Sequence, residues 1–155
     1  MTEWDKKSAE TAEQIGQGLI EFIEKTEFGT PQYQAVSDYL YLKQSEQSLK
    51  QLQENALTKD EGSEGKIYWE TQARIREQKI ALLELQIYQN QSRIRGYDSA
   101  YTHIGIGFEH NLVSVAYREA EQLFANDKQQ QRFYVSDLYE RFFDKAQDTV
   151  NGKRG

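Results

Sequence analysis

The chain has 155 residues, no cysteine, 37% hydrophobic and 28% charged residues, and a formal net charge of -6. Its length is typical of one domain, the lack of cysteine excludes disulfide scaffolds and thiolate metal sites, and the low apolar content disfavours a thick buried core. Because 12% of the residues are aromatic, more than disordered chains carry, we expect long amphipathic helices in a single domain over residues 1–155.

The N-terminal segment MTEWDKKSAETAEQ (1–14) contains no apolar run long enough for a signal peptide or a membrane span. It therefore favours a cytoplasmic protein with no membrane partner, although a secretion route that uses no leader stays open. From about Ser8 to Thr26, apolar residues recur every three or four positions and predict a first amphipathic helix. With Ala9 and Gly16, this helix would carry a stripe of small residues that lets another helix approach.

A second helix is predicted to begin at Pro31. Thr30 followed by Pro31 is typical of a helix N-cap and first helical position. No helix breaker follows until Gly62, so the pattern predicts one helix of about 25 residues with a polar middle. The stretch TKDEGSEG (58–65) gathers turn formers and acids and predicts an exposed, mobile loop.

A third long helix is predicted to end at Gly96, a candidate C-cap. The residues at one heptad position are Ala73, Ile80, Ile87 and Ile94, and those at its partner position are Arg76, Leu83 and Asn90. This pattern predicts a coiled-coil-like seam, so that residues 31–95 form a long antiparallel helical hairpin, the spine of the fold. We expect a second neighbour to cover another apolar line on the same helix, formed by Ile75, Leu82 and Leu85.

The stretch THIGIGFEHN (102–111) places two glycines between the two histidines of the chain. The apolar spacing over 97–126 predicts a helix, although residues 101–108 also alternate like a short strand. A phosphate-binding loop would need a third glycine where His110 stands. We expect instead that this glycine pair and the pair in IGQG (15–18) mark close helix crossings, one candidate being a crossing of the two pairs; flexible helix ends are the alternative.

Few residues are candidates for chemistry. On a helix, His103 and His110 would lie on one face about 10 Å apart, too far for one zinc ion. Neither follows a glutamate by three residues, as a di-iron site in a helical bundle requires. Ser99 and Ser114 stand in no nucleophile turn. Polar helix faces are the simpler interpretation of Asp98, Glu109 and Glu119, so we assign no catalytic, metal-binding or cofactor-binding residue and predict no cofactor.

A last helix is predicted after the polar stretch ANDKQQQ (125–131). Ser136 is its predicted N-cap, with Asp137 and Glu140 in the first turn. The C-terminal helical part would then cover about residues 97–150 and leave 151–155 as a flexible tail.

The charge is unevenly distributed along the chain. Residues 1–65 hold six Lys and Arg against thirteen Asp and Glu, whereas residues 66–155 hold thirteen against twelve. The acidic first part disfavours nucleic acid as a partner. One alternative function is nevertheless a nucleic-acid-associated regulator, with a recognition helix from Ser136 and phosphate contacts from Arg74, Arg76, Arg93, Arg95, Arg132 and Arg141. A second alternative is a histidine-dependent metal enzyme.

The expected fold is all-α, with four to five helices and the hairpin as its spine. A two-helix seam buries little apolar surface, so a protein partner or a second copy of the chain is expected to complete it. We therefore predict a non-enzymatic adaptor, assembly or regulatory protein that acts through helix packing. The predicted interface residues are Trp69, Ile80, Leu83 and Ile87 in the seam, and Tyr134, Tyr139 and Phe143 on the last helix.

Overall fold

The computed structural model describes residues 11–153, and in that range every regular element is a helix. The elements are α2 (Ala12–Lys25), α3 (Pro31–Leu57), α4 (Glu64–Arg93), α5 (Tyr97–Thr102), the π-helix η1 (His103–His110), α6 (Asn111–Leu123) and α7 (Lys128–Lys153). Because α5, η1 and α6 follow one another directly, they form one long interrupted helix. The prediction of an all-α fold with four to five helices is confirmed.

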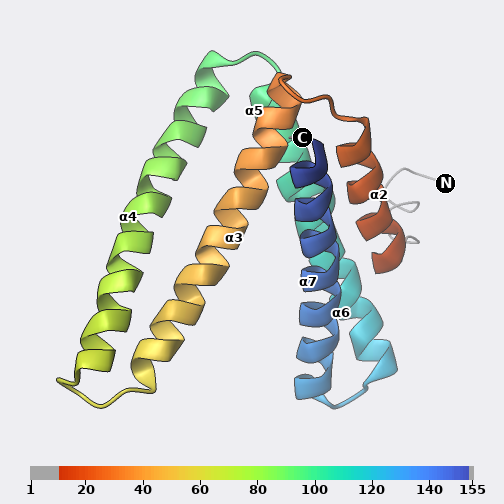
Figure 1. Ribbon diagram of the computed structural model, residues 1–155. Helices are drawn as coiled ribbons and strands as arrows, with labels where there is room; N and C mark the ends of the chain where they lie inside the picture. Colours follow the sequence, from red (N-terminus) through yellow and green to blue (C-terminus); the bar gives the residue numbers. More distant parts are fainter. Residues whose placement is uncertain (1–10, 154–155) are drawn as a thin grey trace.

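The two longest helices form the predicted hairpin. Figure 1 shows α3 and α4 side by side and antiparallel, with α4 at the edge of the molecule. Helix α3 begins where the sequence predicts, since the Thr30 hydroxyl accepts the backbone N–H of Tyr33 at 3.1 Å. Ser63 caps α4 in the same way. Gly62, with a φ of +75°, allows the tight connection between the two helices.

The hairpin has its own small apolar cluster. Ile80, Leu83 and Ile87 of α4 are buried there against α3 and α5, together with Ala35, Leu42, Tyr97 and Ala100. Towards the loop, α4 buries only Ala73. The predicted seam therefore lies inside the chain, and its distal half is only partly buried, with Leu49, Leu52 and Trp69 half-buried.

The main core lies on the other side of α3, where α2, η1, α6 and α7 meet its N-terminal half (Figure 1). Gly16 permits the closest approach in this core, because a Cβ atom at this position would overlap the ring of Phe142 on α7. The close crossing predicted for the first glycine pair is thus present, but its partner is α7. Ala9, also assigned to the small-residue stripe, lies outside the described residues.

The second glycine pair lies in η1, so residues 101–108 are helical and do not form a strand. A Cβ at Gly105 would come within 3.3 Å of the ring of Tyr39 on α3. At Gly107 the nearest side chain is that of His103, in the same helix. The helix of the first pair does meet η1, because a Cβ at Gly18 would lie 3.4 Å from the ring of Phe108. The first pair thus contacts α7 through Gly16 and η1 through Gly18. Gly105 makes room for α3, and Gly107 makes room for a histidine lying along its own helix.

Two predictions about the last helix are wrong. Helix α7 begins at Lys128, so Ser136 lies inside it and is not an N-cap. The start is fixed earlier because Asp127 accepts the backbone N–H of Gln130 at 3.1 Å, and the buried Gln131 amide donates to the Phe124 carbonyl at 2.9 Å. The helix also continues through residues 151–153, which were expected to be a flexible tail; residues 154 and 155 lie outside the described range.

Candidate functional site

The seven predicted interface residues do not form one accessible surface. Ile80, Leu83 and Ile87 are 4–8% exposed and belong to the hairpin cluster. Tyr134, Tyr139 and Phe143 pack on the main core instead. Their hydroxyl and ring contacts are also internal: Tyr134 donates to Glu119 at 3.0 Å, and Phe143 stacks on Tyr139 with ring centroids 4.4 Å apart.

Trp69 is half-buried and has the Tyr68 ring at its edge, with ring centroids 5.1 Å apart. Ile80, Leu83, Ile87 and Phe143 are therefore buried inside the chain, whereas Trp69, Tyr134 and Tyr139 are partly exposed. An interface at the three partly exposed residues stays a prediction.

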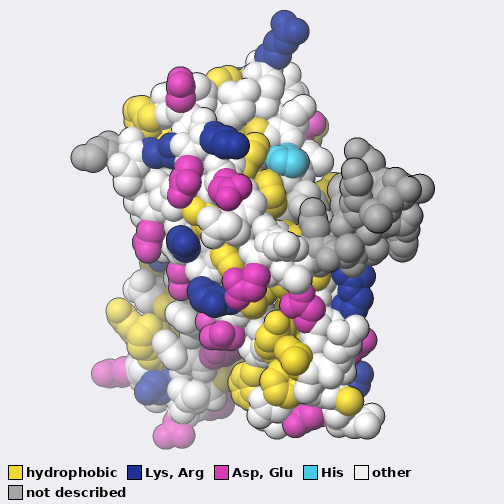
Figure 2. All heavy atoms as spheres, turned by 90° about the vertical axis from the view of Figure 1, so that its right-hand side faces the viewer, with side chains coloured by type: hydrophobic (Ala, Val, Ile, Leu, Met, Phe, Trp, Pro, Cys, Tyr) yellow, Lys and Arg dark blue, Asp and Glu magenta, His cyan; other side chains and the backbone are white. Residues whose placement is uncertain are grey.

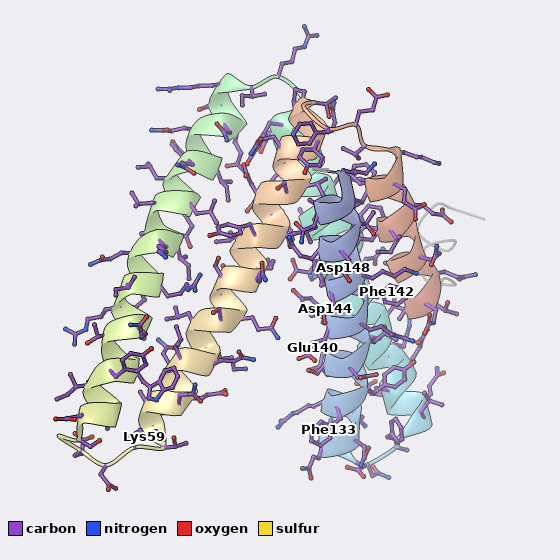
Figure 3. All side chains as sticks on the ribbon, in the orientation of Figure 1. Lys59, Phe133, Glu140, Phe142, Asp144 and Asp148 are labelled. Atoms are coloured by element: carbon purple, nitrogen blue, oxygen red, sulfur yellow. The ribbon has the colours of Figure 1, made fainter. Side chains whose placement is uncertain are left out.

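An accessible apolar surface lies on the opposite side of α4. We use the name outer face of α4 for Tyr68, Ile75, Leu82 and Leu85, whose spacing of seven and three residues places them along one side of the helix. Leu82 is 63% and Leu85 53% exposed. The second neighbour expected to cover Ile75, Leu82 and Leu85 is therefore absent from the described chain. In Figure 1, α4 has α3 on one side only, and Figure 3 shows side chains projecting from its free side.

The charges beside the outer face have one sign through its central and C-terminal turns. At about 100° per residue, Arg74 lies on one side of the stripe, and Lys79 and Arg93 lie on the other. All three are exposed, and none forms an ion pair within the described part of the chain. Glu77 instead lies on the side of α3, where its carboxylate accepts a hydrogen bond of 3.4 Å from Gln53.

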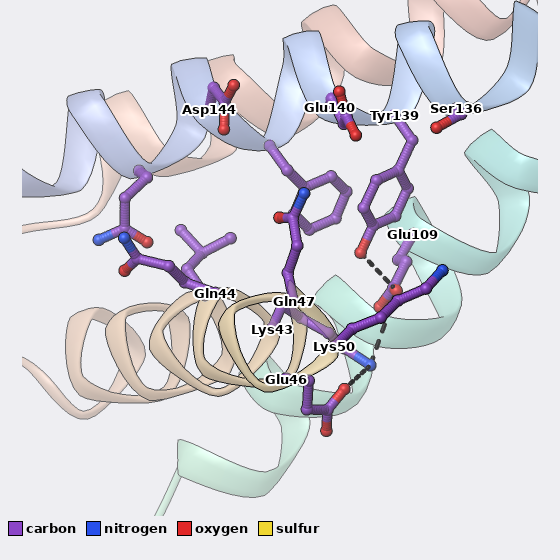
Figure 4. Close-up of a pocket in the computed structure, with 13 residues that line it drawn as sticks. Lys43, Gln44, Glu46, Gln47, Lys50, Glu109, Ser136, Tyr139, Glu140 and Asp144 are labelled. Carbon is purple, nitrogen blue, oxygen red and sulfur yellow. Dashed lines mark hydrogen bonds and ion pairs between the residues drawn. The ribbon is translucent and has the colours of Figure 1, made fainter. Parts of the chain in front are cut away.

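A polar cleft of about 390 Å³ lies between α3 and α7 (Figure 4). Its α3 wall contributes Lys43 and Lys50, and its α7 wall contributes the exposed acids Glu140 and Asp144. Figure 3 shows Glu140, Asp144 and Asp148 along the side of α7 that is turned towards α3. No ion pair joins these acids to the α3 lysines among residues 11–153, so the walls stay apart along this stretch.

Glu109 of η1 lies at the base of this cleft and joins three helices. Tyr139 of α7 donates a hydrogen bond of 2.9 Å to its Oε1 atom, and Lys43 of α3 lies 3.7 Å from the same oxygen. Burial raises the pKa of the Glu109 carboxyl above its usual value, although the hydrogen bond from Tyr139 acts in the opposite direction. Sequence reasoning mentioned Glu109 only as a polar helix residue, because no local pattern shows that a π-helix turns it towards α3 and α7.

The raised pKa of Glu109 predicts a loss of stability with rising pH. The folded state holds the carboxyl proton of Glu109 more tightly than the unfolded state does. Protonated Glu109 therefore makes its full contribution to the free energy of unfolding below the usual carboxyl pKa of 4.5, and this contribution is lost as pH rises through the folded-state pKa. Glu109→Gln keeps an acceptor for Tyr139 but cannot ionise. We expect its free energy of unfolding, relative to wild type, to increase from about pH 4 to about pH 7 in urea titrations.

Glu140→Gln is the matched control, because Glu140 is an exposed acid of the same cleft. The free energy of unfolding of Glu140→Gln should differ from that of the wild type by the same amount throughout this pH range. A constant difference between Glu109→Gln and wild type would show that Glu109 ionises equally easily in both states.

The residues of the two alternative functions are dispersed. His103 and His110 are both exposed, and the His103 ring packs edge-on against Phe22 and Phe108. Between residues 11 and 153, no group of three or more His, Asp and Glu side chains is arranged to hold a metal ion. The arginines proposed for phosphate contacts lie on different helices, and Arg141 pairs with Glu13.

Figure 2 shows basic and acidic side chains interspersed over the visible part of the face that carries α2 and α6. That face offers no broad positive field. None of the described helices is both long and apolar enough to cross a membrane. Comparison of the chain with protein-family models, curated proteins and solved structures finds no match.

Proposed function

We propose that the protein is a non-enzymatic helical adaptor or assembly protein that binds a partner helix through the outer face of α4. The observation that carries this proposal is the exposure of Leu82 and Leu85 in register with Ile75, opposite a side of the same helix that is already buried. An apolar row that repeats at heptad spacing along a helix is complementary to a second helix. At 30 residues, α4 is about 45 Å long, enough for an interface of several heptads.

The weak packing of the distal hairpin supports the same function. From residue 45 to the loop, α3 buries only Ser45 and Ala56, and the facing part of α4 buries only Ala73. The larger apolar residues of this half, Leu49, Leu52 and Trp69, are only partly buried, so this half of the hairpin gains less from its own seam than the half with Leu83 and Ile87. A partner helix long enough to reach Tyr68 and Ile75 would add contacts on these distal turns, beyond those it makes with Leu82 and Leu85.

The proposal is tested with a synthetic helix of about three heptads that carries leucine at the two seam positions and glutamine at the flanking positions. We expect it to bind the full-length protein in a fluorescence anisotropy titration, and we expect Leu82→Ser with Leu85→Ser to weaken binding at least tenfold. Leu57→Ser is the control, because Leu57 is 79% exposed and lies on α3. Equal affinity of the double variant and the wild type, or no binding at all, would refute the function.

A further inference from the structure

The charges around the outer face of α4 identify the kind of helix that fits it. We infer that the partner is a helix of another protein with acidic residues on both sides of its apolar seam, an inference that rests on the proposed function. Residues beside a helix–helix seam meet the flanking residues of the partner, and opposite charges there set partner choice. Arg74 on one side of the outer face, and Lys79 and Arg93 on the other, supply only positive charge at these positions.

These cations are free to pair with a partner. Lys43, Lys66 and Arg141 form ion pairs with acids of the chain, but none joins Arg74, Lys79 or Arg93 to an acid within residues 11–153. The acids in the middle of α4, Glu70, Glu77 and Glu84, are displaced by about 100° or more from the centre of the stripe. Glu70 and Glu77 line a hollow together with Arg74, although no ion pair joins them to it. No acid of α4 stands three or four residues from Lys79 or Arg93, and a partner with acidic flanks would provide counter-charges there.

A second copy of the chain fits this surface poorly. Two identical outer faces would place Arg74 and Lys79 of each copy around the same seam, so the flanks would repel rather than attract. The overall charge of the chain does not favour self-association either, because it is -6. Both kinds of partner would pack on the same apolar residues. The flanking charges favour an acidic helix of another protein over a second copy of the chain.

Two polar residues in the stripe further restrict the partner. Thr71 and Gln78 occupy the seam positions between Tyr68, Ile75 and Leu82. A polar side chain at a seam position is satisfied best by a polar side chain from the partner and thereby fixes the register of the two helices. The partner seam is therefore expected to be apolar opposite Leu82 and Leu85 and to offer a polar residue opposite Gln78.

The test compares three synthetic helices that share one leucine seam and differ only at the flanking positions, which are glutamate, glutamine or lysine. At low ionic strength, we expect the glutamate helix to bind the full-length protein at least about tenfold more tightly than the lysine helix, with the glutamine helix between them. The difference should shrink as salt is added, because the flanking charges are exposed. Arg74→Glu with Lys79→Glu should reverse the order of the glutamate and lysine helices.

Arg132→Glu with Lys145→Glu is the control, because it makes the same change of net charge on exposed residues of α7. This control should keep the wild-type order of affinities. Equal binding of all three helices, or an order that the Arg74 and Lys79 variant leaves unchanged, would overturn the acidic partner while leaving helix binding through Leu82 and Leu85 intact. Dimerisation of the protein that Leu82→Ser abolishes, or binding to anionic phospholipid vesicles in preference to the glutamate helix, would also overturn it. Failure of every helix to bind would instead refute the proposed function itself.

Discussion

Replacing Phe142 by alanine is expected to lower the free energy of unfolding by about 3–5 kcal/mol. Its ring is 5% exposed and fills the crossing of α2 and α7 directly over Gly16. Gly16→Ala alone should cost about 1–3 kcal/mol, because the added methyl group has no room beside that ring. These two changes probe one contact, so their effects should not be additive.

The decisive result is whether Gly16→Ala raises or lowers the free energy of unfolding, measured once with Phe142 in place and once in the Phe142→Ala variant. Once Phe142 is alanine, the steric conflict is gone and the better helix propensity of alanine remains, so Gly16→Ala should stabilise the protein by up to about 1 kcal/mol. Gly152→Ala is the control, because a Cβ at that helical position meets no atom within 4 Å. Urea unfolding followed by circular dichroism measures all four variants. If Gly16→Ala is equally destabilising in both backgrounds, the close crossing is not where the structure places it.

The second large effect separates two neighbouring leucines of α4. Leu83→Ala should lower the free energy of unfolding by about 2–3 kcal/mol, because Leu83 is 8% exposed in the hairpin cluster. Leu82→Ala should change it by less than about 0.5 kcal/mol, because Leu82 is 63% exposed on the outer face. The substitution is the same at both positions, so helix propensity cancels in the comparison.

The stability changes of the two variants are compared by chemical unfolding of the purified protein. The protein concentration is chosen so that the measured molar mass is that of one chain. A Leu82→Ala variant destabilised as much as Leu83→Ala would mean that a further element of the protein covers the outer face. In that case neither the adaptor function nor the acidic partner could use this surface.

The positions of several helix ends could be predicted from the sequence because they depend on neighbouring residues alone. Thr30 and Pro31 supply a cap and a fixed backbone angle, and the structure starts α3 there. The C-cap predicted at Gly96 is wrong by two residues, because α4 ends at Arg93 with Ile94 as its C-cap. Gly96 is instead the N-cap of α5, with a φ of +91° that other residues rarely adopt. The seam through Ile80 and Ile87 could also be predicted from the sequence, because heptad spacing places both residues on one side of α4.

The start of α7 and the role of Glu109 depend on contacts that sequence spacing does not contain. The polar residues before Ser136 are typical of a loop, but Gln131 is buried and donates to the carbonyl of Phe124, which stabilises a turn of helix there. Glu109 acquires its pKa shift because Tyr139 and the surrounding helices bury it. These effects arise only when segments far apart in the chain come together.

That α4 is apolar on two sides follows from the order of its residues, since periodicity depends only on the helix repeat. Which side is buried depends on how many neighbouring helices the rest of the chain supplies, and this is visible only in the folded molecule. Helix α3 covers Ile80 and Leu83, while α2, α6 and α7 gather on the far side of α3 around the larger main core. Leu82 and Leu85 stay in solvent because no described helix is left to cover them.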